Sequence, residues 1–288
     1  MIRLIRSELM KVRTTNVWLV FTIGVLLSAA IMAIIWINVG SSQIDEARIM
    51  FAVPEELSPK EKEEWIRTHD LGPILANTAA QIYTSGQFLG ILFVMLLGAI
   101  VVTNEYHHQT ATATFLATPK RTKVIVAKLI TAISFAGFYW LVTTVFNGVL
   151  GILFFFSEGY DPQLGDWTVI RAVLMNGLAF GLWGILGVAL GVLIRNQIGA
   201  VITGSVLYVV GSYAIILVYG LIYAFWIKKQ WILSSMVIWP SMASQIMVSP
   251  EKVYPQSPDW WVGALVLVGY GIVFGTIGTM IARKRDVS

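Results

Sequence analysis

Six long apolar runs alternate with polar segments along the chain, and this alternation leaves few folds open. A run of about 20 apolar residues can cross the hydrocarbon layer as a helix, because a helix satisfies its own backbone hydrogen bonds. Only 12% of the residues are charged and the mean hydropathy is +0.74, whereas about 25% are charged in a typical soluble domain. The sequence therefore predicts an all-α integral membrane protein with six transmembrane helices.

Charged and helix-breaking residues set the predicted boundaries. In chain order we expect an interfacial helix 1–16, span 1 at 17–38, an acidic loop 39–79, span 2 at 80–103, a polar loop 104–128, span 3 at 129–157, a turn 158–168, span 4 at 169–194, a turn 195–197, span 5 at 198–226, a broken segment 227–261, span 6 at 262–282 and a tail 283–288. Together these pieces form one transmembrane domain.

Three segments outside the spans have patterns that predict local structure. Residues 1–16 place apolar side chains on one helical face and bases largely elsewhere, which is typical of an amphipathic helix at a membrane surface. In the acidic loop, Ser58 and Glu61 predict a capping box at the start of a short helix, which Gly72-Pro73 is expected to stop. The prolines in 227–261 prevent a simple span and favour re-entrant or interfacial short helices.

Charge predicts the orientation. With six spans both termini lie on one side, and the pieces on that side hold 12 Lys and Arg against three acids, whereas the other side holds 8 against 13. Because loops rich in Lys and Arg stay in the cytoplasm, the termini and the loop 104–128 are predicted to be cytoplasmic. The segments 39–79, 158–168 and 227–261 are then extracytoplasmic.

Several kinds of chemistry lack the residues they need. Cysteine is absent, no phosphate-binding Gly-rich loop occurs, and no Asp or Glu lies in the middle of a predicted span, where ion-driven transporters carry such groups. His107 and His108 lie near Glu105 but lack a clear third metal ligand, so a hydrated loop facing a partner is the expected reading and no metal is predicted. Uphill transport would therefore need energy from another subunit.

Polar residues and closely spaced glycines inside the apolar runs allow more than one interpretation. The polar residues could line a substrate path or could bond to preceding helical carbonyls, with tyrosine marking an interface; they are Gln81, Thr84, Ser85, Gln87, Thr203, Ser205, Tyr208 and Ser212. The glycines could serve tight helix packing or a dimer interface, or could be spaced by chance; the pairs are Gly177 with Gly181, Gly187 with Gly191, and Gly271 with Gly275.

Two stretches resemble a known family. Thr103–Thr110, Phe115–Arg121 and Ala127–Leu129 together resemble the conserved intracellular loop of type-2 ABC transporter permeases, and Ser7–Arg13 resembles the elbow that opens such chains. Where the family usually has a basic residue, glycine and threonine, this chain has His108-Gln109-Thr110.

The resemblance implies a half-transporter with an N-terminal elbow helix, a cytoplasmic coupling helix in 104–128 and re-entrant helices between spans 5 and 6. Two permease copies, as a homodimer, would join two separate ATPase subunits that bind ATP and Mg. They would export an amphipathic or hydrophobic compound, such as a drug, antibiotic, peptide or lipid, across a bacterial or archaeal cell membrane. This chain would bind no cofactor and no nucleic acid, and would not itself be an enzyme.

Roles for individual residues follow from the same resemblance. The residues expected to contact the ATPase are Glu105, Tyr106, His107, His108, Gln109, Thr110, Phe115 and Leu116. The bases expected to hold the elbow and the loop at membrane lipid headgroups are Arg3, Arg6, Lys11, Arg13, Lys120, Arg121 and Lys123. A secondary transporter or channel without an ATPase, and a membrane sensor or scaffold, remain the alternatives.

Overall fold

The computed structural model describes residues 1–54, 56–110, 114, 116 and 121–284, apart from the side chains of residues 121 and 282–284. Within these residues every regular element is helical. Six helical stretches in the described chain are long and apolar enough to cross a membrane, or seven if one bent pair counts as a span. The predicted all-α, multi-pass membrane architecture is confirmed at this level.

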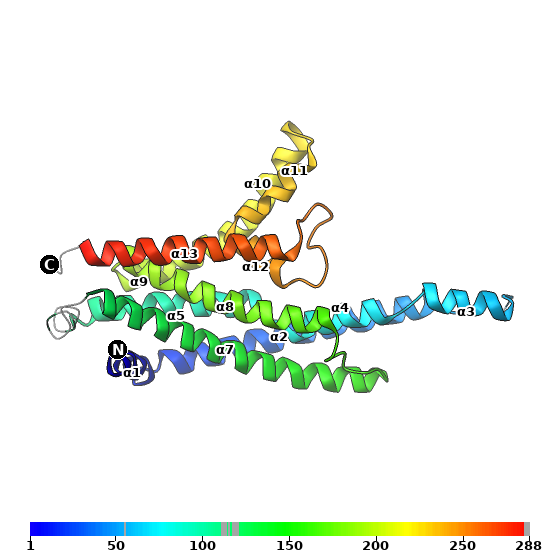
Figure 1. Cartoon of the computed structure of the whole chain (residues 1–288), viewed down its shortest axis with the longest axis horizontal. Helices are drawn as coiled ribbons and strands as arrows, with labels where there is room; N and C mark the ends of the chain where they lie inside the picture. The colour runs from blue at the N-terminus through cyan, green and yellow to red at the C-terminus, as the bar shows by residue number, and fades with distance from the viewer. Residues whose placement is uncertain (55, 111–113, 115, 117–120, 285–288) are drawn as a thin grey trace.

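The elements in chain order are α1 (Ile2–Arg13), α2 (Val17–Met50), α3 (Pro59–Thr68), α4 (Gly72–Tyr83), α5 (Gln87–His107), α7 (Arg121–Glu158), α8 (Trp167–Leu193), α9 (Gln197–Ser205), η1 (Val206–Val210), α10 (Gly211–Leu221), η2 (Ile222–Trp226), α11 (Gln230–Ser234), η3 (Ser235–Ile238), α12 (Pro240–Val248) and α13 (Trp260–Lys284). The long helices run side by side, and Met1 and Lys284 lie at the same end of the bundle (Figure 1). We call this the terminal end and the opposite end the far end.

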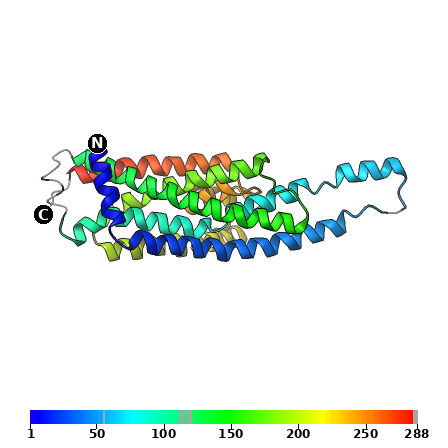
Figure 2. The ribbon, with the colours of Figure 1, turned by 90° about the horizontal axis from the view of Figure 1, so that it is seen from below.

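Helix α1 is set across the terminal end of the bundle (Figure 2). Its first and last turns are largely exposed, but Glu8 and Val12 are buried against the helices beneath it. The burial of a carboxylate in an otherwise amphipathic helix requires a partner, because an unpaired buried charge is costly. For Glu8 that partner is Lys128 of α7, 2.7 Å away.

The second apolar run is interrupted near its start. Helix α4 ends at Tyr83 and α5 begins at Gln87, so the predicted span 80–103 is not one straight helix. At the break Gly86 has φ +79°, and a Cβ on it would lie 2.6 Å from Cα of Ala29 in α2. Asn147 of α7 donates a hydrogen bond to the freed carbonyl of Ser85 at 2.8 Å. A left-handed residue pressed against a neighbouring backbone explains the break.

The far end carries an extension beyond the bundle. Helix α2 continues to Met50, past the predicted end of its span at residue 38, and its last turns and α3 project from the other helices (Figure 2). The capping box of Ser58 and Glu61 is present as predicted. The prediction that Gly72-Pro73 stops this helix was wrong, because α3 already ends at Thr68 and Gly72-Pro73 begins α4. Proline suits a first turn because its missing N–H would have no helical partner there.

A network of contacts ties this extension to α7. Arg48 of α2 donates to the hydroxyl of Tyr160 and to the carbonyl of Glu158, both at 2.9 Å. The carboxylate of Glu158 lies 3.4 Å from the same guanidinium, and Ser41 donates to it at 3.2 Å. The outer part of α2 is therefore fixed to the last residue of α7.

Helices α5 and α8 pack so closely that glycine is required. A Cβ on Gly187 would collide with the carbonyl oxygen of Met95, and one on Gly191 would lie 2.6 Å from that of Ala99. Gly181, on the same helix, has nothing within 4 Å of such a Cβ. The proposed use of Gly187 and Gly191 in tight packing is thus confirmed within the chain, whereas Gly181 makes no such contact.

The fifth apolar run leaves the bundle part-way along its length. It contains two π-helical turns, η1 and η2. Helices α10 and α11 form a hairpin that stands away from the long helices of the bundle (Figure 1). The chain then returns through two short helical segments, Gln230–Ile238 (α11 with η3) and α12, which are bent by 97° relative to each other. This is the pair of short helices that the prolines of 227–261 indicated, and Pro240 begins the second of them.

Candidate functional site

Four buried or half-buried charges join three helices at the terminal end. Lys11 of α1 lies 2.5 Å from a carboxylate oxygen of Glu8 and 2.5 Å from one of Glu105, at the end of α5. Lys128 of α7 lies 2.7 Å from Glu8 and 3.1 Å from Glu105, and it donates to the carbonyl of Val101 at 3.0 Å. We call Glu8, Lys11, Glu105 and Lys128 the ion cluster.

The ion cluster is electrically balanced. Lys128 is 2% exposed and Glu8 is 1% exposed, so each of these charges is tolerated only because opposite charges surround it. Burial alone would lower the pKa of Lys11, but the two adjacent carboxylates outweigh it and raise the pKa of Lys11 above its ordinary value. Lys11 therefore stays charged throughout the neutral range, and the cluster holds α1, α5 and α7 together.

The predicted polar loop 104–128, which we call the polar segment, leaves α5 through a tight turn. The N–H of Thr110 donates to the carbonyl of Glu105 at 2.8 Å, and the N–H of Gln109 donates to that of Tyr106 at 3.3 Å. These two bonds form a Schellman motif, which needs a left-handed residue after the helix. Gln109 supplies it with φ 54°, where the resembling family usually has glycine.

Replacing Gln109 with glycine is expected to stabilise the protein. A left-handed conformation costs a residue with a Cβ about 1–2 kcal/mol, which glycine does not incur; the more flexible unfolded chain of the variant offsets part of that gain. We expect Gln109→Gly to raise the free energy of unfolding by about 0.5–1 kcal/mol in a thermal melt. Gln109→Ala keeps the Cβ and should give no gain; an equal gain from both variants would contradict this account.

The segment expected to contact a partner is only partly available at the surface. His107, His108, Gln109 and Thr110 are exposed, and Leu116 is 79% exposed. Glu105 is buried, and its carboxylate is engaged by the ion cluster and by the hydroxyl of Thr114 at 3.2 Å. Tyr106 is half-buried under the guanidinium of Arg195, 5.2 Å from its ring centre. Phe115 lies outside the described residues.

Only some of the bases expected at lipid headgroups have exposed side chains. Exposed side chains belong to Arg3, Arg6, Arg13 and Lys123. Lys11 is instead used in the ion cluster. Lys120 and the side chain of Arg121 lie outside the described part of the chain.

A polar cavity of about 460 Å³ gathers the first half of the expected path. Gln81, Thr84, Ser85 and Gln87 all line it, at the break between α4 and α5. Its wall also includes Phe88 of α5, Met32 and Trp36 of α2, and residues 248–253 at and after the end of α12. Ser85 is 4% exposed, and its hydroxyl has no partner among the described residues. We call this the far cavity, because it opens on the far-end side of Phe88.

The other four residues of the expected path do not line one common cavity. Tyr208 is buried and lines a separate apolar cavity, which we call the inner cavity. Ser212 donates its hydroxyl hydrogen bond to the carbonyl of Tyr208, the kind of helical bond that the alternative reading anticipated. Thr203 and Ser205 are half-buried and line neither cavity.

One pair of aromatic rings links the walls of these cavities. Phe88, in the wall of the far cavity, and Tyr208, in that of the inner cavity, have ring centres 4.9 Å apart. Trp183 packs edge-on against the other side of Tyr208, with 4.8 Å between ring centres. Phe88 and Tyr208 therefore bring the walls of the two cavities into direct contact.

Comparison with known families places the chain in one of them. Residues 67–288 match the family described as a protein of unknown function, DUF2705. The chain belongs to the DUF2705 family. No curated protein matches it. In this DUF2705 protein the matched region covers the inner cavity, the polar segment and all of the far cavity except Met32 and Trp36. It does not include α1, so the ion cluster joins Glu105 and Lys128 of the family region to Glu8 and Lys11 outside it.

Sequence reasoning missed the ion cluster, although its members were visible. Glu8 interrupts a basic amphipathic helix, and Lys128 directly precedes an apolar run. Opposite charges beside apolar spans are expensive unless paired, which is the signal that could have linked them. The pairing itself is long-range, 120 residues for Glu8 and Lys128, and no local pattern specifies it. No group of three potential metal ligands occurs among the described DUF2705 residues.

Proposed function

We propose that this chain is the permease subunit of an ATP-driven exporter of the type-2 ABC class, with its termini and polar segment in the cytoplasm of a bacterial or archaeal cell. Two copies would work with two separate ATPase subunits. The resemblance of residues 103–129 and the excess of bases on the terminal side support this assignment. The exported compound would be amphipathic or hydrophobic, in keeping with the apolar inner cavity.

The observation that carries the proposal is the direct connection that α5 makes between the polar segment and the cavities. Glu105, at one end of α5, is held in the ion cluster, and Phe88, at the other end, lines the far cavity and contacts Tyr208 in the wall of the inner one. Seventeen residues of helix span about 26 Å. A displacement of the docked segment would be transmitted along α5 to Phe88, which is what an ATPase must achieve to open and close a path.

This arrangement gives the predicted coupling residues different tasks. Glu105 acts inside the chain, because it fixes the polar segment to α1 and α7. The exposed His107, His108 and Leu116 are the side chains available to an ATPase surface. An exposed leucine can fill an apolar groove of a partner, and polar side chains such as His107 and His108 can fix the orientation of the contact.

The test of the assignment is reconstitution with a partner. An affinity-tagged chain purified from its own host membranes should bring an ATPase with it, and the complex in liposomes should hydrolyse ATP. A second tag on a separate copy should be recovered with the first, as a homodimer requires. Flux driven by an ion gradient in liposomes that contain the chain alone would overturn the proposal in favour of a secondary transporter.

Substitution of Leu116 should separate docking from folding. We expect Leu116→Ser to reduce the amount of co-purified ATPase about tenfold, the usual effect of removing a well-buried apolar anchor from an interface. Leu164→Ser is the matched control, because Leu164 is also an exposed leucine, 55% exposed, but lies in the turn before α8 at the far end. Equal recovery of ATPase with both variants would contradict the docking role of Leu116.

A further inference from the structure

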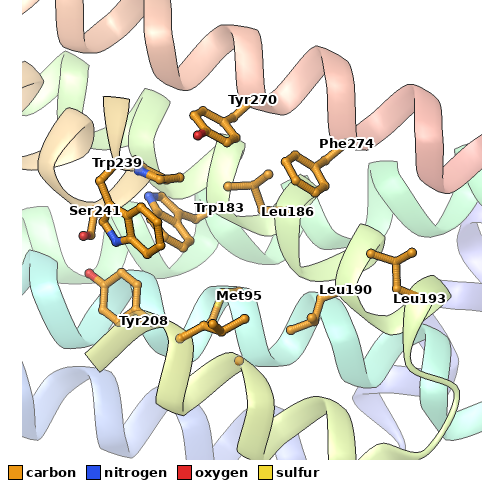
Figure 3. A pocket seen from close by; sticks show the side chains of 13 residues that line it. Met95, Trp183, Leu186, Leu190, Leu193, Tyr208, Trp239, Ser241, Tyr270 and Phe274 are labelled. Carbon is orange, nitrogen blue, oxygen red and sulfur yellow. The ribbon is translucent and has the colours of Figure 1, made fainter. Parts of the chain in front are cut away.

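The inner cavity has the size of a binding site for a small ligand. Its volume is about 370 Å³, and it lies between α5, α8, α13, the η1 turn and the start of α12 (Figure 3). Ligand sites in proteins typically have about 300–1,000 Å³. Much of its wall is apolar, formed by Met95, Leu186, Leu190, Leu193 and Phe274.

Polar atoms gather at one end of this cavity. Figure 3 shows the oxygen atoms of Ser241 and Tyr208 close together beside the indole rings of Trp183 and Trp239, whereas Leu190 and Leu193 lie at the opposite end. Ser241 is 1% exposed and Trp183 is 5% exposed. The hydroxyl of Ser241 and the indole N–H of Trp183 have no hydrogen-bond partner among the described residues.

Unpaired polar atoms of this kind indicate a missing partner. A buried donor or acceptor without a hydrogen bond destabilises the folded chain, and the great majority of buried polar groups are paired. The indole N–H can only donate and the serine hydroxyl can donate or accept, so the partner must offer an acceptor such as a hydroxyl or ester oxygen. The same end includes the π-helical turn that carries Tyr208, a backbone feature that often occurs at functional sites.

The cavity wall also defines the charge of the ligand. None of the described residues that line it is Asp, Glu, Lys, Arg or His. An ionised group placed there would lose its hydration without gaining an opposite charge, which is strongly unfavourable. The distance along α8 from Trp183 to Leu193 is about 15 Å at 1.5 Å per residue, which suits an extended hydrocarbon chain.

We propose that the inner cavity binds an uncharged amphiphile with a single hydrocarbon chain, such as a monoacylglycerol or a long-chain alcohol. Its polar end accepts hydrogen bonds from Trp183 and Ser241, and its chain lies along Leu186, Leu190 and Leu193. This deepens the proposed function, because it names the class of compound that the exporter would carry, and it rests on that function only for the transport step. Binding itself requires no ATPase.

The test is photolabelling of the purified chain in phospholipid nanodiscs with 1-monolauroylglycerol that carries a diazirine on the second carbon of its acyl chain. Labelling should be saturable and should map to peptides containing Tyr208, Trp183 or Ser241. Excess 1-monolauroylglycerol should abolish it, whereas equal amounts of dodecyl phosphate or dodecyltrimethylammonium should not. Competition by the charged compounds to the same extent, or label spread without saturation over lipid-facing helices, would overturn the proposal.

Two variants show whether the polar end determines binding. Ser241→Ala should lower the affinity for the probe about fivefold, the effect of one lost hydrogen bond of about 1 kcal/mol. Leu190→Trp should fill the chain end and reduce labelling further, with the helical content checked by circular dichroism. Unchanged affinity in folded samples of both variants would overturn the site. Because no ATPase is present, this failure would leave the docking role of Leu116 to its own test.

Discussion

Removing the positive charge of Lys128 is expected to destabilise the protein by about 3–5 kcal/mol, the usual cost of breaking a buried ion pair from one side. Lys128→Met leaves the hydrocarbon volume of the side chain nearly unchanged but removes the charge that lies 2.7 Å from Glu8 and 3.1 Å from Glu105. Two buried carboxylates would then share Lys11 alone. The measurement is unfolding in SDS-containing mixed micelles, followed by circular dichroism.

A control and a rescue separate this effect from a general loss of charge. Lys123 is exposed on the same helix, so Lys123→Met should change the free energy of unfolding by no more than about 0.5 kcal/mol. Adding Glu8→Gln to Lys128→Met restores the balance of charge, because Lys11 then pairs with Glu105 alone, and it should recover about half of the loss. Similar losses for Lys123→Met and Lys128→Met would show that the cluster has no special role.

The second large effect is expected at the contact of α5 with α8. Gly187→Ala would place a methyl group against the carbonyl oxygen of Met95. Since backbone cannot move aside as a side chain can, the two helices must separate, and overpacking of this kind costs about 1–3 kcal/mol or more. The midpoint of thermal unfolding in detergent should fall accordingly.

The same helix provides the matched control for this substitution. Gly181→Ala adds a methyl group where nothing lies within 4 Å. Alanine is about 1 kcal/mol more favourable than glycine in a helix interior, so this variant should be neutral or slightly stabilised. A comparable loss of stability in Gly181→Ala and Gly187→Ala would mean that close packing at Gly187 is not what requires glycine.

The parts of the fold that sequence predicted best are those set by local chemistry. Long apolar runs specify membrane-crossing helices whatever their neighbours, and the capping box of Ser58 and Glu61 involves only adjacent turns. The break at Gly86 was not predicted, because glycine within an apolar run looks like any other packing residue. A side chain at this position is excluded by the backbone of Ala29 in α2, which lies 57 residues earlier in the sequence.

The same distinction applies to the candidate site. The four polar residues from Gln81 to Gln87 were recognised as unusual at their depth, and they do line one cavity. Their grouping follows from short sequence separation. Glu105, in contrast, was assigned to a partner surface from the family resemblance of its segment, whereas in the structure it is buried and paired with Lys11 and Lys128. Which polar side chains face inward depends on helices that meet only in the folded chain.

Helix α7 is long enough to transmit a movement from one end of the bundle to the other. Its 38 residues correspond to about 57 Å, nearly twice the thickness of about 30 Å of a hydrocarbon layer. Lys128 fixes it in the ion cluster near one end, and Glu158 fixes it to Arg48 at the other. A rigid rod of this length that tilts by about 5° about one end moves the other by about 5 Å. A movement that begins at the ion cluster would therefore change distances at the opposite side of the membrane. Spin labels on the solvent-exposed turns of α2 and α3 would measure that change in distance.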